Sequence, residues 1–167
     1  MDERQRFKEV FAHLGFAIYR GQVFEHNLVT ALVLTELIPK LGGRPVNEPE
    51  WQRIALEFVT HHSKATLGCL LRRVKTIVDL PDDLEQLLAE GLCARNWAAH
   101  SFFTDSRFDT DQNRYRTIGR LKECYDRIDA ADTAFERLIK PVRERHGYTD
   151  EFVAQKAKQF GDSTHDL

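Results

Sequence analysis

The sequence lacks any apolar run that approaches the length of a membrane span. Its longest unbroken apolar runs are a few residues, such as Leu32-Val33-Leu34, whereas a helix needs roughly 20 apolar residues to cross a bilayer. The first residues, Met1-Asp2-Glu3-Arg4, also lack the hydrophobic segment of a secretion signal. We therefore expect a cytoplasmic protein that has no membrane partner.

A disulfide scaffold and a generally basic surface are absent as well. The three cysteines, Cys69, Cys93 and Cys124, are odd in number and widely spaced, unlike a disulfide framework. The net charge of −2 excludes a basic nucleic-acid-binding coat, although it leaves room for a local basic groove. Hydrophobic residues make up 42% of the 167 residues, which is typical of a globular domain. We expect one domain over residues 1–160 and a disordered tail over 161–167.

Strand patterns are missing too, because no segment sustains an alternation of apolar and polar residues. Apolar residues instead recur at the three- and four-residue spacing of amphipathic helices. Asn47 is an expected N-cap and Gly147 an expected helix stop. The expected helices cover about 4–38, 49–62, 63–78 (separate or a continuation), 81–103, 113–145 and 150–159. The sequence therefore predicts an all-α fold, a four- to five-helix up-down bundle.

The helix over residues 84–103 is apolar on nearly all sides, so we expect it to be central and buried. It nevertheless carries Arg95, Asn96 and His100. Asn96 and His100 are four residues apart, close enough for the amide to orient the imidazole. Arg95 and His100 are about 140° apart on an α-helix, so we expect no direct contact between them. They would instead converge on a bound anion or across a two-fold axis.

The first helix contains a matching exception, because Glu25 falls in the middle of its apolar stripe. A lone buried carboxylate is costly, so Glu25 needs a cationic partner. Arg95 or His100 would serve. The small residues Ala17 and Gly21 would let a neighbouring helix come close.

The run 91–103, Gly-Leu-Cys-Ala-Arg-Asn-Trp-Ala-Ala-His-Ser-Phe-Phe, resembles the motif of HEPN domains. That motif is an arginine, a polar residue (often asparagine), three variable residues and a histidine. The run 14–25 and Thr66-Leu67-Gly68 also resemble small bacterial HEPN-like proteins. Arg-x4-His alone would occur by chance about 0.7 times in this composition, and the added asparagine lowers this to roughly 0.016. Many toxin members have tyrosine where this chain has Phe102.

The resemblance implies a HEPN-like bundle, and many HEPN proteins are metal-independent ribonucleases in toxin–antitoxin, phage-defence and RNA-processing systems. By this resemblance His100 would accept the proton of a ribose 2′-hydroxyl, and Arg95 would stabilise the phosphate. Asn96 would hold the imidazole or the phosphate, and Glu25 would position His100 or neutralise Arg95. The products would carry 2′,3′-cyclic phosphates. The implied partners are RNA, a second copy in a homodimer, and an antitoxin or regulatory protein, with no cofactor and no metal.

Several alternatives stay open at this point. Arg95 and His100 could be a structural hydrogen-bond network, or the chain could be a non-catalytic HEPN-like module. Such a module would bind a nucleotide, nucleic acid or protein partner, as an antitoxin or regulatory subunit does. His61 and His62 are expected at the surface or its boundary. Five further arginines are candidates for an RNA path, although charge clusters are more often solvated faces; they are Arg72, Arg73, Arg114, Arg116 and Arg120.

Overall fold

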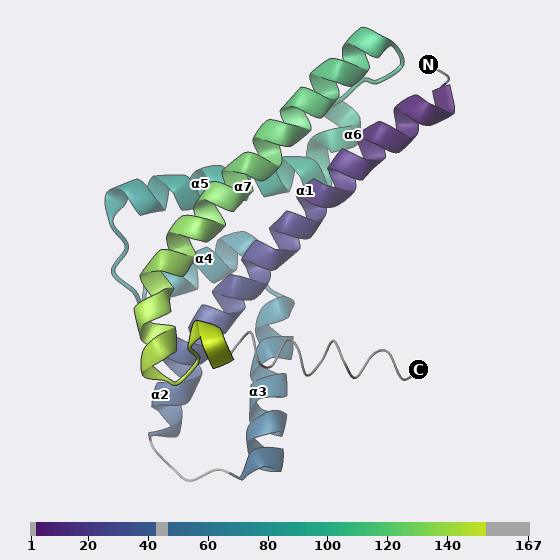
Figure 1. Ribbon diagram of the computed structural model, residues 1–167. Coiled ribbons are helices and arrows are strands. Elements are labelled where there is room, and N and C mark those ends of the chain that lie inside the picture. The colour runs from purple at the N-terminus through teal and green to yellow at the C-terminus, as the bar shows by residue number, and fades with distance from the viewer. Residues whose placement is uncertain (1–2, 43–46, 153–167) are drawn as a thin grey trace.

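The computed structural model describes residues 3–42 and 47–152, and within these ranges the chain forms helices and no strand (Figure 1). The longest helical segment joins α1 (Glu3–Leu32), a π-helical turn η1 (Val33–Leu37) and α2 (Ile38–Leu41). The next helices are α3 (Glu48–Ser63) and α4 (Leu67–Lys75). A third segment joins α5 (Asp82–Asn96), a second π-helical turn η2 (Trp97–Ser101) and α6 (Phe102–Asp105), and α7 (Asp111–Arg145) follows. The prediction of an all-α bundle is confirmed.

Local signals set most of the helix ends. The Asn47 side chain accepts a hydrogen bond of 2.9 Å from the Glu50 N–H, which confirms the predicted cap of α3. Gly147 adopts φ +83° directly after α7, as a helix stop requires. α7 begins slightly earlier than predicted, because the Thr110 side chain caps it through the Asn113 N–H at 3.2 Å. Residues 150–152 are helical, whereas the rest of the predicted helix 150–159 and the tail 161–167 lie outside the described residues.

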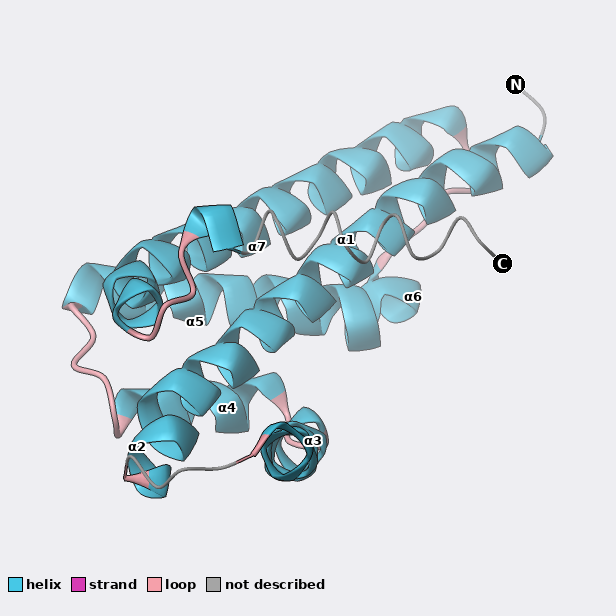
Figure 2. Ribbon diagram, turned by 60° about the horizontal axis from the view of Figure 1, so that its bottom comes forward, coloured by secondary structure: helices cyan, strands magenta, loops and turns pink. Residues whose placement is uncertain are grey.

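The bundle is built around α1 and α7, which lie side by side and run in the same direction (Figure 1). Ion pairs join them at two levels along their contact, Glu9 with Arg114 and Arg20 with Asp129. α5 packs against both and runs in the opposite direction. Figure 2 looks nearly along α3 and shows this helix at the edge of the molecule, away from α7.

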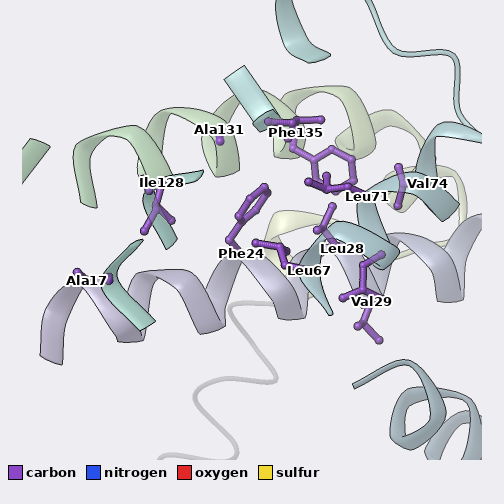
Figure 3. Packing of buried hydrophobic residues seen from close by; sticks show 14 of the residues in the cluster. Ala17, Phe24, Leu28, Val29, Leu67, Leu71, Val74, Ile128, Ala131 and Phe135 are labelled. Atoms are coloured by element: carbon purple, nitrogen blue, oxygen red, sulfur yellow. The ribbon is translucent and has the colours of Figure 1, made fainter. Parts of the chain in front are cut away.

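The core lies between α1 and α7 and extends to buried side chains of α4 and α5. Phe24 and Leu28 of α1 meet Ile128 and Phe135 of α7, and all four side chains are buried (Figure 3). Burial of each such side chain contributes about 1.5–3 kcal/mol, so this layer holds the two long helices together. In the described part of the chain, no helix is both long and apolar enough to cross a membrane.

The prediction that the helix over residues 84–103 is central and buried holds for one side of the helix and is wrong for the other. Leu84, Leu88 and Ala94 face the core, but Ala89 and Cys93 are exposed. The apolar residues of this helix form two stripes, and only one of them packs against α1 and α7. The other stripe lines an open cavity, so apolar side chains on nearly all sides do not imply burial on all sides.

Candidate functional site

The centre of the candidate site is a direct contact between Arg95 and His100, which the sequence analysis did not expect. Arg95 Nη1 lies 3.4 Å from His100 Nε2. The α-helical period would place the two residues about 140° apart, but the π-helical turn η2 intervenes. Such a turn is closed by hydrogen bonds between residues five apart, so it brings residue i+5 back towards residue i. The expectation that they do not touch is therefore wrong.

The expected pairing of Arg95 with Glu25 is in place. The Arg95 guanidinium donates to Glu25 across the α1–α5 interface, and both side chains are about one quarter exposed. The close approach depends on Gly21, because an ideal Cβ at that position would lie only 2.8 Å from Arg95 Cγ. The prediction that Glu25 has a cationic partner is confirmed, and so is the use of Gly21 as a point of close approach.

Asn96 also contacts the guanidinium, since Arg95 Nη1 donates to Asn96 Oδ1 at 3.2 Å. A guanidinium carries hydrogen-bond donors only, so His100 Nε2 accepts in its contact with Arg95. This arrangement places the proton of a neutral imidazole on Nδ1 and leaves the lone pair of Nε2 facing Arg95. Arg95 thus joins a carboxylate, an amide and an imidazole, and Asn96 is placed to hold the guanidinium rather than to orient His100.

Arg95, Asn96 and His100 lie on the wall of an open cavity of about 980 Å³. Asn96 and His100 are exposed, so solvent reaches the imidazole. Lys64 also lines the cavity, and none of the described lining residues is an aspartate or a glutamate. In a chain with 26 acidic residues, this composition favours an anionic ligand over a cationic one.

The floor of the cavity is the second apolar stripe of α5. Ala89, Leu92 and Cys93 precede Asn96 and His100 along it at helical spacing, and Trp97 adds an aromatic ring. Trp97 is held from behind by Arg120, whose guanidinium carbon lies 4.1 Å from the ring centroid. The apolar residues that looked like core in the sequence therefore line a ligand-sized space.

The five arginines considered as an RNA path do not come together. Arg72 and Arg73 lie on α4, and the other three lie at the first turns of α7, at the opposite end of the bundle (Figure 1). Arg73 is bound to Glu36, and Arg120 lies over Trp97. The Arg114 side chain is only 3% exposed and is paired with Glu9, so it faces the protein interior.

Two further polar positions are shaped by their surroundings. Hydrogen bonds from Arg73, including one of 2.7 Å, lower the pKa of the Glu36 carboxyl to about 2. His62 was expected at the surface or its boundary, but it is buried against Phe58, and desolvation lowers its pKa. Neither residue lines the cavity beside His100.

The cysteines differ sharply in their environments. Cys69 is exposed next to the cavity wall, and hydrogen bonds with Thr66 and then Arg72 lower its pKa. Cys124 is buried and donates to the Ala94 carbonyl, and burial raises its pKa to about 11. Within the described ranges, no three histidine, cysteine, aspartate or glutamate side chains gather as metal ligands would.

Sequence reasoning missed Lys64 and the apolar floor. Lys64 follows α3, more than 30 residues before Arg95, and no local pattern connects the two. The floor did leave a signal, because Ala89, Leu92, Asn96 and His100 share one helix face that mixes small, apolar and polar residues. A second apolar stripe that ends in polar residues is typical of a ligand cavity rather than a core.

No protein-family model, no curated protein and no solved structure matches this chain. The geometry of the site therefore carries the functional argument.

Proposed function

We propose that the protein is a metal-independent endoribonuclease that cleaves RNA at the Arg95–His100 centre. The observation that carries the proposal is the direct pairing of a guanidinium and an exposed imidazole at the edge of a cavity lined without acids. Guanidinium binds phosphate oxygens bidentately, and histidine is the side chain best suited to proton transfer near neutral pH. Phosphodiester cleavage by the neighbouring hydroxyl needs both groups at one phosphorus.

The reaction would proceed by internal transfer. His100 Nε2 accepts the proton of the ribose 2′-hydroxyl while the 2′-oxygen forms a bond to the adjacent phosphorus. The bond from phosphorus to the 5′-oxygen of the next nucleotide breaks, and that oxygen takes a proton from the imidazolium or from water. Arg95 neutralises the charge that grows on the non-bridging oxygens. The products are a 2′,3′-cyclic phosphate and a free 5′-hydroxyl.

The surrounding contacts support these roles. The 3.4 Å separation of Arg95 Nη1 and His100 Nε2 is long for a hydrogen bond, so a phosphate oxygen and a ribose hydroxyl can replace it. Glu25 holds the guanidinium through Nη2, whereas Asn96 and His100 contact Nη1. Phe102, the position of the tyrosine in many HEPN toxins, is buried, so this side chain is not available to the substrate.

The resemblance to HEPN domains supports the same chemistry. The wider role as a toxin or defence enzyme, the homodimer and any antitoxin or regulatory partner rest on that resemblance alone. The proposed cytoplasmic location rests on the sequence, which has no apolar run long enough to span a bilayer. The alternative of a non-catalytic binding module remains an outcome of the experiment that follows.

The test is cleavage of a mixed RNA substrate in the presence of EDTA by wild type and by His100→Ala. We expect cleavage by wild type with cyclic-phosphate ends, and a loss of at least about 100-fold in His100→Ala, because a general base contributes roughly 10²–10⁴-fold. His146→Ala, at the far end of α7, is the matched control and should cleave like wild type. Intact RNA with folded wild-type protein would contradict the proposal and favour the binding module.

A further inference from the structure

The cavity has a wall that the cleavage chemistry leaves unused. This wall is the junction between α3 and α4, from Lys64 to Gly68. It stands directly on the apolar floor, since an ideal Cβ at Gly68 would lie in ordinary contact with Leu92 Cδ2, at 3.7 Å. Lys64 is exposed, and no carboxylate of the described residues pairs with it. Two cations therefore line the cavity, Lys64 at the α3–α4 junction and Arg95 on α5.

The floor of the cavity is apolar. Ala89, Leu92 and Cys93 form it together with the ring of Trp97. A cavity with an apolar floor and two cations carried by different segments of the chain fits a ligand that has an aromatic body and two anionic groups. The volume of about 980 Å³ lies at the upper end of the range for small-molecule pockets, so a nucleotide fits inside.

We infer that the cavity binds one nucleotide of single-stranded RNA, with its base on the Leu92–Trp97 floor and one of its phosphates at Lys64. The other phosphate is then the one attacked beside Arg95 and His100. A base can reach this floor only when it is unpaired and unstacked, whereas the bases of a duplex are paired and stacked inside it. The inference rests on the proposed function for the identity of the ligand, and it adds the strandedness of the substrate and the residues that bind it.

Binding is tested with a fluorescently labelled, unstructured RNA strand whose riboses are all 2′-O-methylated. This probe has no attacking hydroxyl, so wild-type protein binds it without cleavage. We expect Lys64→Gln to weaken binding about tenfold and to reduce the slope of log K against log salt by about 0.7, the value of one single-strand phosphate contact. Ala89→Trp fills the floor from an exposed position, so it should weaken binding at least about tenfold with the fold intact.

Matched controls separate these effects from general ones. Lys122→Gln removes an exposed charge from α7, and Ala130→Trp adds the same ring at an exposed position of α7; both should bind like wild type. The same strand annealed to its complement should bind at least about tenfold more weakly than the single strand, because its bases cannot reach the floor. Circular dichroism on every variant verifies the fold.

The inference is overturned if wild type does not bind the single strand, if it binds the duplex equally well, or if Lys64→Gln and Ala89→Trp bind like their controls. Its failure can be told apart from that of the proposed function. Binding that depends on Lys64 and Ala89 without cleavage of unmodified RNA would refute only the nuclease. Cleavage with unchanged KM in both variants would refute only the nucleotide site.

Discussion

Gly21→Ala should damage the site while leaving the fold intact. The new Cβ would lie 2.8 Å from Arg95 Cγ and 3.7 Å from Arg95 Cβ. Carbon atoms in contact are separated by about 3.5–4.0 Å, so the Arg95 stem must retreat by about 1 Å. The guanidinium then loses its alignment with Glu25 and His100, and a misplacement of about 1 Å can reduce a rate about 100-fold.

The stability of the same variant should change little. Alanine is favoured over glycine in a helix interior by about 1 kcal/mol. The Arg95–Glu25 pair is partly exposed, so its weakening costs no more than about 1 kcal/mol. The two effects offset each other. We expect a fall in kcat/KM of about 10- to 100-fold and a free energy of unfolding within about 1 kcal/mol of wild type.

Gly91→Ala is the matched control, because it should have the opposite effect. Its Cβ would lie 2.6 Å from Ala131 Cβ and 3.6 Å from the Arg127 carbonyl oxygen. These atoms belong to the α5–α7 interface and cannot swing aside as a long side chain does. Overpacking of this kind costs about 1–3 kcal/mol, whereas the cavity residues are untouched.

Urea unfolding and RNA cleavage, measured on both variants, separate the two effects. With an m-value of about 2 kcal/mol/M, a cost of about 1–3 kcal/mol should lower the urea midpoint of Gly91→Ala by about 0.5–1.5 M, while its activity per folded molecule is kept. Gly21→Ala should keep the urea midpoint of wild type and lose activity per folded molecule. Full activity in Gly21→Ala, with its midpoint unchanged, would refute the claim that the position of Arg95 is set by this glycine.

The remaining predictions concern protonation. The pKa of Glu36 is lowered from 4.5 to about 2 by hydrogen bonds from Arg73, so its stabilising effect is complete above about pH 4.5 and is lost as the pH falls towards 2. Glu36→Gln should therefore lower the free energy of unfolding at neutral pH by up to about 3 kcal/mol, and it should make this free energy depend less on pH between about pH 2 and 4.5. Urea unfolding measured at several pH values tests this, and a free energy of unfolding that changes with pH as in wild type would contradict it. Among the cysteines, Cys69 should react first with a thiol reagent at neutral pH, because it is exposed and its hydrogen bond with Thr66 lowers its pKa. Cys124 should react only after unfolding, because it is buried and burial raises its pKa. A fast reaction of Cys124 in the folded protein would show that its burial is incomplete.

The helices could be predicted from sequence because their signals are local. The cap at Asn47 and the stop at Gly147 act within a few residues, and the apolar spacing extends along each helix. The partnership of Glu25 with Arg95 could also be predicted, since a carboxylate in an apolar stripe needs a cation. The sequence offered only Arg95 and His100 within the neighbouring apolar helix.

The cavity could not be predicted in the same way. The apolar residues of a stripe that lines a cavity are of the same types as those that pack in a core, so α5 looked like a buried helix and only the polar residues at the end of the stripe marked the difference. Lys64 reaches the site only because the α3–α4 junction stands against α5, which is a property of the tertiary fold. The net charge of the whole chain, −2, also gives no indication that the described lining of this cavity contains no aspartate or glutamate.

The two π-helical turns explain the remaining error. Each carries a polar residue that binds an arginine, Glu36 with Arg73 in η1 and His100 with Arg95 in η2. A wider turn shifts one side chain to a new direction, and the helix continues afterwards, so Phe102 is still buried beyond η2. An α-helical projection of the sequence therefore places the core residues before and after η2 correctly, but it misplaces His100, which lies within η2. In an apolar helix, a polar pair at positions i and i+5 has two arrangements, apart on an α-helix and together on a π turn. The contact of Arg95 with His100 follows from the second arrangement, and this contact joins two residues that an α-helix would hold apart into the single polar centre on which the proposed function rests.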